Sequence, residues 1–211
     1  KNPTAWRTRG LHLLLTTGGL GTNKDELERA VKSLLPALER QRAHHLPVSI
    51  LYYAGTNLDH KKMVQSIAKK AGIPVSSPAN ENGRLRVLYA DDLVDANLLL
   101  LKYGFPWADV VVTKPSGDMA YDAVAAGCPV LFLEPWGEWE KVIARNFLKL
   151  GVAQWAKADA LSAQITELAV SEGSGASAKT SDQESQKSQK SQQSSQPWIQ
   201  QAIETVLEMP L

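Results

Sequence analysis

The chain has 211 residues, 44% of them hydrophobic, which is enough for one domain with a well-packed core. Its formal net charge of +1 gives no electrostatic reason to expect nucleic-acid binding, and its apolar runs are shorter than the ~20 residues that a membrane-spanning helix needs. The single cysteine, Cys128, excludes an internal disulfide framework and indicates a reducing compartment such as the cytoplasm. Because the chain starts at Lys1 rather than at Met, we expect it to be a piece of a longer protein.

The first predicted strand runs directly into a glycine-rich loop. Residues 11–16 (LHLLLT) form an apolar run, and Gly18, Gly19, Leu20 and Gly21 follow before a helical pattern begins. Glycine at three of these four positions allows backbone N–H groups to approach a ligand, and the start of a helix adds a positive dipole end. The spacing does not match a Walker phosphate loop, so the segment is either a phosphate cradle or a plain tight turn.

Strand and helix patterns alternate along the next 150 or so positions, at the element lengths usual for compact domains. Further strands are expected at residues 48–53, 73–76, 84–89, 109–112, 130–133 and 152–155, and helices at residues 23–42, 59–71, 93–103, 118–126, 141–150 and 159–170. This alternation is typical of an α/β protein with parallel strands. The sequence therefore predicts a Rossmann-like, doubly wound parallel sheet.

The composition changes after residue 170. Residues 171–196 are rich in Ser, Gln and Lys and almost free of apolar side chains, so we expect a disordered low-complexity segment. Apolar residues then recur at helical spacing within residues 197–211, at Ile199, Ile203, Val206 and Leu207. The predicted organisation is one folded domain at residues 1–170, a linker, and an amphipathic helix that docks back on the domain.

Three predicted loops fall at the carboxyl edge of the sheet, where open α/β folds bind their ligands. They comprise residues 17–23, 113–118 and 136–140. In the second loop, Lys114 and Ser116 precede a helix whose first N–H groups are free, so an anion there would meet an ammonium, a hydroxyl and a helix dipole. A diphosphate suits this arrangement. The simpler alternative is that Ser116 only caps the helix and Lys114 is solvated.

Other features of the sequence could suggest a metal site or a hydrolase, but they support neither. The segment YADD at residues 89–92 is similar to the two-metal motif of polymerases, but the chain is too short and lacks a basic groove. The histidines have no metal-ligand spacing; they are His12, His44, His45 and His60. A Gly-x-Ser-x-Gly turn, which a serine hydrolase would need, is absent. The sequence therefore predicts no metal site.

Three motifs, in this order, resemble those of a known family. TTGGLG (residues 16–21), YADDL (89–93) and TKPSGDMAYDAVAAGCPVLF (113–132) are similar to the donor-binding signatures in the C-terminal domain of UDP-sugar glycosyltransferases of the GT-B fold. Within that family the likeness is to monogalactosyldiacylglycerol synthases, processive diacylglycerol glucosyltransferases and lipid II-forming N-acetylglucosaminyltransferases. It extends from about residue 11 to residue 168 and implies that the chain is one half of a GT-B fold.

This resemblance implies a function. The chain would hold the donor of an inverting glycosyltransferase that moves a hexose or N-acetylhexosamine from a UDP-sugar to an acceptor, with lipids among the candidate acceptors. The acceptor and the general base would belong to an N-terminal domain or partner subunit that this chain lacks, and any peripheral membrane contact would run through that part. No cofactor or metal is implied, because Lys114 and a helix dipole would stabilise the leaving diphosphate.

The same resemblance implies positions for the donor. They are Gly18, Gly19, Leu20 and Gly21 at the diphosphate or acceptor side, the backbone of Tyr89 and Ala90 at uracil, Ser116, Gly117, Asp118 and Met119 at the phosphates, Asp122 at the ribose, and Glu138 and Glu140 at the transferred sugar. From its sequence position alone, Asp122 is either such a ribose ligand or an exposed helix charge.

The chain also departs from the family pattern. Met119 stands where the family usually has Thr, Asp122 where it has Glu, and Trp139 and Ile143 where the sugar-binding segment has Gln and Asn. These differences favour an alternative, a non-catalytic nucleotide-binding or interaction module on the same fold. A sugar-nucleotide epimerase is a further alternative, for which we find no acid or base residues.

Overall fold

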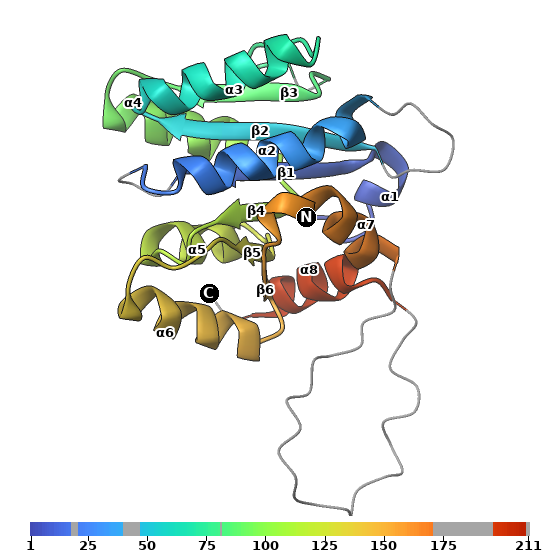
Figure 1. Cartoon of the computed structure of the whole chain (residues 1–211). Coiled ribbons are helices and arrows are strands. Elements are labelled where there is room, and N and C mark those ends of the chain that lie inside the picture. Colours follow the sequence, from blue (N-terminus) through green and yellow to red (C-terminus); the bar gives the residue numbers. More distant parts are fainter. Residues whose placement is uncertain (18–20, 40–46, 81, 171–195, 210–211) are drawn as a thin grey trace, which may run out of the picture.

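The strands of the sheet are parallel, and their order in space differs from their order in the chain. The computed structural model describes residues 1–17, 21–39, 47–80, 82–170 and 196–209. Within them lies a six-stranded sheet with the order β3-β2-β1-β4-β5-β6, seen from top to bottom in Figure 1. The strands are β1 Leu11–Thr16, β2 Val48–Gly55, β3 Leu85–Tyr89, β4 Val110–Thr113, β5 Val130–Phe132 and β6 Ala153–Trp155. This is the strand order of a Rossmann-like doubly wound fold, so the predicted fold class is confirmed.

Helices connect the strands and cover both faces of the sheet. They are α1 Trp6–Arg9, α2 Lys24–Glu39, α3 Leu58–Lys70, α4 Leu93–Leu99, α5 Gly117–Ala125, α6 Glu138–Lys149, α7 Leu161–Val170 and α8 Trp198–Glu208. A π-helical segment, Leu100–Gly104, extends α4. At its end a Cβ on Gly104 would lie only 2.6 Å from Leu100 Cδ1, so a larger residue there would require the Leu100 side chain to shift.

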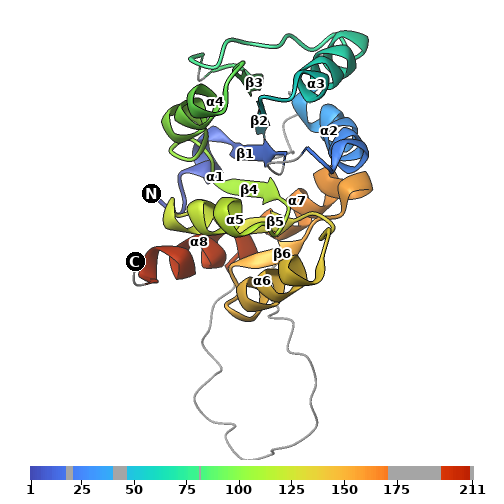
Figure 2. The same cartoon turned by 90° about the vertical axis from the view of Figure 1, so that its left-hand side faces the viewer.

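Apart from the short edge strand β6, the strands are buried on both faces, as expected for parallel strands between two layers of helices. Leu14 of β1 lies opposite Leu51 of β2 on one side and Val111 of β4 on the other. Successive strand residues point to opposite faces: Leu13 and Leu15 pack with α2, α3 and α7, whereas Leu14 packs with α4, α5 and α6. Figure 2 shows α2, α3 and α7 on one side of the strands and α4 and α5 on the other.

Helix α8 packs on the domain through part of its predicted apolar stripe. Ile199 and Ile203 are buried in the layer that contains α7, and Val206 is buried in the opposite layer. Leu207 is 43% exposed, with its Cδ2 near Gly127. Residues 171–195, for which we predicted disorder, lie outside the residues that the structure describes.

The strand predicted at residues 73–76 does not form. Only Ser76 pairs, as a single parallel bridge to Arg86, with its N–H donating to Leu85 O at 2.8 Å. The physical reason is Pro74, which has no N–H to donate to a ladder. The segment therefore lies along β3 without becoming a seventh strand among the described residues.

The loop predicted at residues 136–140 is shorter than expected, because α6 already begins at Glu138. Gly137 occupies the N-cap position, and its carbonyl accepts from the N–H groups of Glu140 and Lys141. Carboxylates in the first turn of a helix are favoured by the helix dipole. Glu138 and Glu140 are thus residues of the first helical turn, and the helix fixes the positions of their backbone atoms.

At the opposite edge of the sheet, Asp109 joins α1 to the start of β4. Its carboxylate accepts from both terminal nitrogens of Arg9, at 2.9 and 2.8 Å, and from the backbone N–H of His12 at 2.9 Å. Asp109 is 3% exposed, whereas 38% of the Arg9 side chain is exposed. The carboxylate therefore serves mainly to satisfy donors at the buried start of two strands.

We predict that Asp109→Ala lowers the free energy of unfolding by about 2 kcal/mol, because it leaves the His12 N–H without its acceptor while Arg9 can turn to water. Urea denaturation checks this. Asp159→Ala is the matched control, since Asp159 pairs with Arg29 through largely exposed side chains, and it should change stability by no more than about 0.5 kcal/mol. Equal effects of the two substitutions would contradict the assignment.

Candidate functional site

The carboxyl ends of β1 and β4 lie side by side at the point where the strand order reverses. Thr16 Oγ1 donates to Thr113 Oγ1 at 2.6 Å, and both side chains are buried. In open α/β sheets the loops that follow two such strands diverge to opposite faces and leave a crevice between them. The residues that follow Thr16 and Thr113 therefore border the position where this fold places a ligand.

A hollow of about 380 Å³ opens at this position. It is lined by Thr22, Asn23, Lys24, Asp25, Glu26, Arg29, Lys114, Glu134, Pro135 and Trp136. These residues come from the loops after β1, β4 and β5 and from the first turns of α2. The three loops that we predicted to converge on one edge thus meet at a single hollow.

Lys114 is a buried residue of this hollow. It is 3% exposed, and its ammonium lies 3.2 Å from Glu140 Oε1 and 3.3 Å from Thr22 Oγ1. Glu140 is 4% exposed, and its second oxygen accepts from the backbone N–H of Trp136. The alternative that Lys114 is solvated is therefore wrong: an ammonium is held beneath the crevice, with its charge balanced by Glu140.

The β5–α6 turn is also fastened to the start of α2. Glu26 accepts from Glu134 N–H at 3.0 Å through one oxygen and from Asn23 Nδ2 at 2.8 Å through the other. Asn23 Nδ2 also lies 3.4 Å from Glu134 O. Sequence reasoning missed Glu26; its only signal is that an acidic residue in the first turn of a helix is free to accept from neighbouring loops.

Ser116 occupies the N-cap position of α5, yet its hydroxyl makes no capping hydrogen bond to the described residues. The N–H groups of Gly117, Asp118 and Met119 form the first turn, where a helix offers no backbone acceptors. A Cβ on Gly117 would meet only Ile143 Cδ1, at 3.9 Å, which is an ordinary contact. The packing of the fold therefore does not require glycine here. These residues follow Lys114 along the chain but do not line the hollow.

Two residues of α5 lie differently from each other. Asp122 is exposed, one helical turn beyond Asp118, which is exposed as well. Met119 is half-buried and packs against the core layer that contains α5 and α6. Asp122 is thus accessible to a ligand at the helix start, whereas the Met119 side chain takes part in packing.

Tyr89 and Ala90, at the end of the edge strand β3, are not brought into the hollow. Three strand spacings separate β3 from β4, about 14 Å. The Ala90 N–H donates to Gly55 O at 3.2 Å, and the Tyr89 hydroxyl donates to Asp91 at 2.8 Å. That bond to a carboxylate raises the pKa of Tyr89. Both residues still lie at the same edge of the sheet as Lys114.

Gly21 is the one glycine of the predicted phosphate loop that the structure describes; Gly18, Gly19 and Leu20 lie outside the described residues. Its φ of +62° favours glycine, and a Cβ would lie 2.4 Å from Asn57 Nδ2. Local geometry is therefore enough to explain Gly21.

A buried histidine fixes the position of Gly21. His60 Nε2 lies 3.1 Å from Gly21 O, and Nδ1 lies 2.6 Å from the Tyr52 hydroxyl. Because a carbonyl only accepts, Nε2 carries the hydrogen and Nδ1 accepts from Tyr52. Burial lowers the pKa of His60 and raises that of Tyr52. This neutral chain of hydrogen bonds ties the loop after β1 to α3.

Glu138 and Glu140 lie in different surroundings. Glu138 is exposed and pairs with Lys141 at 2.6 Å, which lowers the pKa of Glu138. Glu140 points inward to Lys114, as described above. Near them Trp136 and Trp139 are exposed, with their rings 6.3 Å apart in an edge-to-face contact. The two indoles are thus the accessible groups on this side of the hollow.

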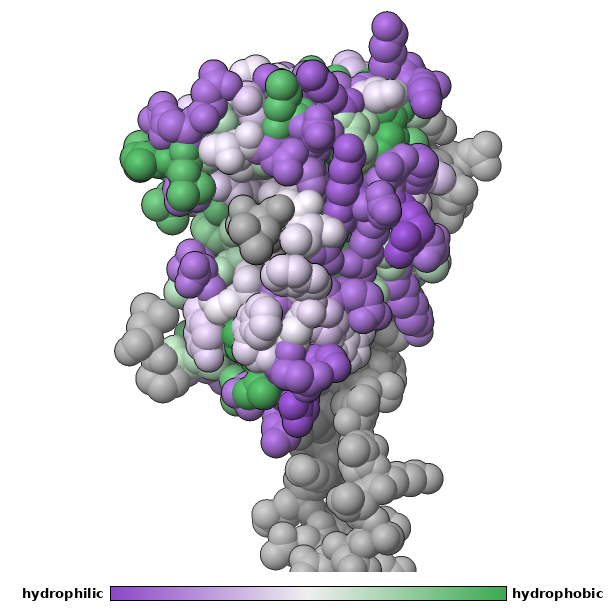
Figure 3. All heavy atoms as spheres, turned by 60° about the vertical axis from the view of Figure 1, so that its left-hand side comes forward, coloured by the Kyte–Doolittle hydropathy of each residue, from purple (hydrophilic) through white to green (hydrophobic). Residues whose placement is uncertain are grey.

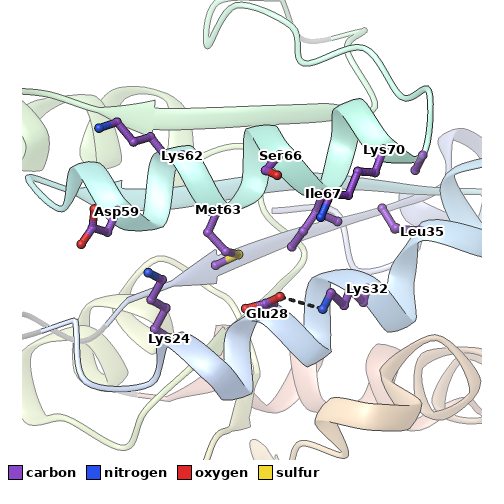
Figure 4. Close-up of a pocket in the computed structure, with 11 residues that line it drawn as sticks. Lys24, Glu28, Lys32, Leu35, Asp59, Lys62, Met63, Ser66, Ile67 and Lys70 are labelled. Carbon is purple, nitrogen blue, oxygen red and sulfur yellow. Dashed lines mark ion pairs between the residues drawn. The ribbon is translucent and has the colours of Figure 1, made fainter.

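A larger hollow, of about 570 Å³, lies between α2 and α3 and shares Lys24 with the first (Figure 4). It is lined by Lys24, Glu28, Lys32, Leu35, Asp59, Lys62, Met63, Ser66, Ile67, Lys70 and Ala71. Two of its charges cancel, since Lys32 pairs with Glu28 at 2.6 Å. Size alone does not make it the candidate site, because it is an open groove between two helices that holds neither a buried charge nor the ends of the strands.

Comparison of the chain with known protein families and with curated proteins finds no match. Among the helices of the described residues, none combines the length and apolar character needed to cross a membrane.

We predict that stability depends on pH through His60. Its pKa is lowered in the folded protein from the ordinary value of 6.5, so the unfolded chain binds the proton more readily. The stability that depends on neutral, buried His60 is therefore fully present above about pH 7.5, and it is lost as the pH falls through 6.5 and below. His60→Gln keeps an acceptor and a donor but does not titrate. Its free energy of unfolding should fall less than that of the wild type between pH 7.5 and 5.5 in urea denaturation, and an unchanged slope would count against His60.

We also predict that Glu140→Gln lowers the free energy of unfolding by about 3 kcal/mol, because it leaves the buried Lys114 ammonium without a counter-charge. Replacing both partners, as Lys114→Met with Glu140→Gln, should restore most of that loss. Glu138→Gln, at an exposed pair, serves as the control and should cost under about 0.5 kcal/mol. Thermal and urea denaturation of the four proteins measure these differences. A double variant less stable than Glu140→Gln alone would contradict the ion pair.

Proposed function

We propose that this chain is the donor-binding half of a UDP-sugar glycosyltransferase and that it acts with an N-terminal domain or partner subunit that supplies the acceptor and the general base. The observation that carries the proposal is the buried Lys114 ammonium at the strand-order reversal, directly before the free N-terminus of α5. A cation that lines the hollow and the N–H groups of a helix that begins three residues after it suit a diphosphate, although these N–H groups do not themselves line the hollow.

The proposed chemistry is an inverting displacement at the anomeric carbon. As the bond to the sugar breaks, negative charge develops on the leaving diphosphate. The Lys114 ammonium and the N–H groups of Gly117 and Asp118 would stabilise that charge, which is the role that a metal ion plays in other transferases. Glu140 holds the Lys114 side chain in place before the donor binds, and a phosphate oxygen would compete with Glu140 for Lys114.

Around this diphosphate site the remaining assignments follow the resemblance. Asp122 is exposed on α5 and would accept from the ribose hydroxyls, and uracil would lie toward Tyr89 and Ala90 at the far end of the same edge. The sugar would lie beside Trp136 and Glu138. We propose that this function belongs to a reducing compartment such as the cytoplasm, as the low cysteine content of the chain indicates.

Two observations favour the alternative, a nucleotide-binding or interaction module without transferase activity. Glu140, which the resemblance assigns to the transferred sugar, is turned inward to Lys114. Met119, where the family has a hydroxyl, is half-buried in the core. A chain that kept the diphosphate site and lost the sugar contacts would show both features.

We predict that the chain binds UDP at millimolar or lower concentration in isothermal titration calorimetry. Asp122→Ala should weaken binding about fivefold to tenfold through the lost ribose hydrogen bonds. Lys114→Met with Glu140→Gln should weaken it more, because the charge at the diphosphate is lost while the fold is kept. Glu208→Ala, at an exposed residue of α8 that does not line the hollow, should leave the affinity unchanged.

Two results separate the possibilities. Failure of UDP to bind at millimolar concentration would exclude the donor-binding function and leave an interaction module. If UDP binds as predicted, but the chain joined to its N-terminal half neither transfers a sugar nor hydrolyses any UDP-sugar tested, the module remains.

A further inference from the structure

The outer face of α4 and of the π-helical segment that extends it carries a dense group of exposed aliphatic side chains among the described residues. Leu93, Val94, Leu98 and Leu101 are 61%, 69%, 57% and 58% exposed. We call these four residues the α4 stripe. Figure 3 shows exposed hydrophobic atoms gathered over α4. A helix on the surface of a monomer normally has a polar outer face, so a contiguous apolar stripe marks a surface that contacts something.

The stripe does not result from α4 being turned the wrong way. Ala96 and Leu100 point inward and are buried in the core layer. Asn97 accepts from the Tyr53 hydroxyl at 2.8 Å, which fixes the rotation of the helix about its axis. Leu93, Leu98 and Leu101 therefore lie outside, while Ala96 and Leu100 on the inner face pack against the core.

Charges at the two ends of the stripe indicate what covers it. Asp91, Asp92 and Asp95 are exposed at its start, and Lys102 is exposed at its end. The carboxylates are crowded: the hydrogen bond and charge of Asp92 raise the pKa of Asp95. Three carboxylates beside Leu93 and Val94 would be repelled by an anionic lipid surface. A partner with a cation at this end is favoured instead.

A second copy of the same chain meets this requirement. In an antiparallel pair of helices, position 97 is the midpoint between Leu93 and Leu101, and it is also the midpoint between Asp92 and Lys102. One two-fold axis near Asn97 therefore brings the two stripes together and sets each Lys102 opposite the carboxylates of the other copy. Under this axis the apolar residues of one copy face those of the other, and each Lys102 faces carboxylates. The surface is therefore self-complementary, as a two-fold interface must be.

We propose that the chain forms a two-fold symmetric dimer through the α4 stripe. The contact spans about 12 residues of helix, roughly 18 Å, which places it at the small end of specific interfaces. The dimer is therefore weak and reversible. It leaves the 380 Å³ hollow open, because that hollow is built from the loops after β1, β4 and β5, whereas α4 follows the edge strand β3. The inference stands independently of the proposed function.

Sedimentation equilibrium of the full chain over a concentration series tests the proposal. The wild type should show a monomer–dimer equilibrium, and Val94→Asp with Leu98→Asp should raise the dissociation constant at least about tenfold. Val142→Asp, at a 50% exposed residue of α6, is the matched control and should leave it unchanged. Circular dichroism verifies that each variant is folded. A wild type that stays monomeric to about 1 mM, or a dimer that persists in the double variant, would overturn the proposal.

Charge reversal tests the two-fold pairing itself. Lys102→Glu alone, and Asp91→Lys with Asp95→Lys alone, should each place like charges opposite one another and lose self-association. Mixed together, the two variants should form a heterodimer, because each reversed end then meets its opposite; Asp92 is kept as the N-cap of α4. A mixture that remains monomeric, or stripe-dependent binding of the wild type to phosphatidylserine vesicles without dimerisation, would refute the two-fold dimer.

Discussion

The pairing of β1 with β4 is the constraint on which the rest of this structure depends. To place β4 beside β1, the connection that leaves β3 must cross back over the sheet. The strand order therefore reverses beside β1. Because every strand is parallel, each connecting loop that follows a strand ends at the same edge, and the loops after β1, β4 and β5 become neighbours although more than 100 residues separate the first from the last. The hollow at that edge is thus a consequence of topology before it is a consequence of particular side chains.

Burial of Lys114 is the second constraint, and it connects the fold to the proposed chemistry. An ammonium removed from water needs a counter-charge, and Glu140 supplies it from the first turn of α6. The same carboxylate fixes the Trp136 backbone, so the turn that borders the hollow and the charge beneath it form one unit. A ligand that binds Lys114 must therefore compete with Glu140 for the ammonium. For this reason the carboxylate bears on the choice between a transferase and a module without activity.

Much of the fold was predictable because it depends on local patterns. Apolar runs ended by glycine or proline turns marked β1, β2, β4 and β5 to within about two residues, and the convergence of three loops followed from parallel strands. The partners of the site were not predictable in the same way. Lys114 and Glu140 are distant in sequence and meet only because β4 and β5 are adjacent, and His60 reaches Gly21 from another helix. The helix expected at residues 93–103 forms, as α4 and its π-helical extension, but leucines surround it and no pattern in the sequence separates the packed side from the exposed one. The start of α6 was misplaced because a glycine N-cap resembles a loop residue.

The unformed strand at residues 73–76 has a consequence for the behaviour of the protein at high concentration. An outermost parallel strand exposes a row of unpaired N–H and C=O groups, which can template the addition of a strand from another molecule. Here Ser76 occupies one position along β3, and the Arg86 guanidinium donates to Pro78 O at 2.8 Å, holding the segment against the strand. Two prolines in this cover, Pro74 and Pro78, deny further donors to an incoming chain. The segment at residues 73–78 therefore hinders the addition of a further strand to β3. We expect it to protect this edge of the sheet from the edge-to-edge aggregation that leads to fibres.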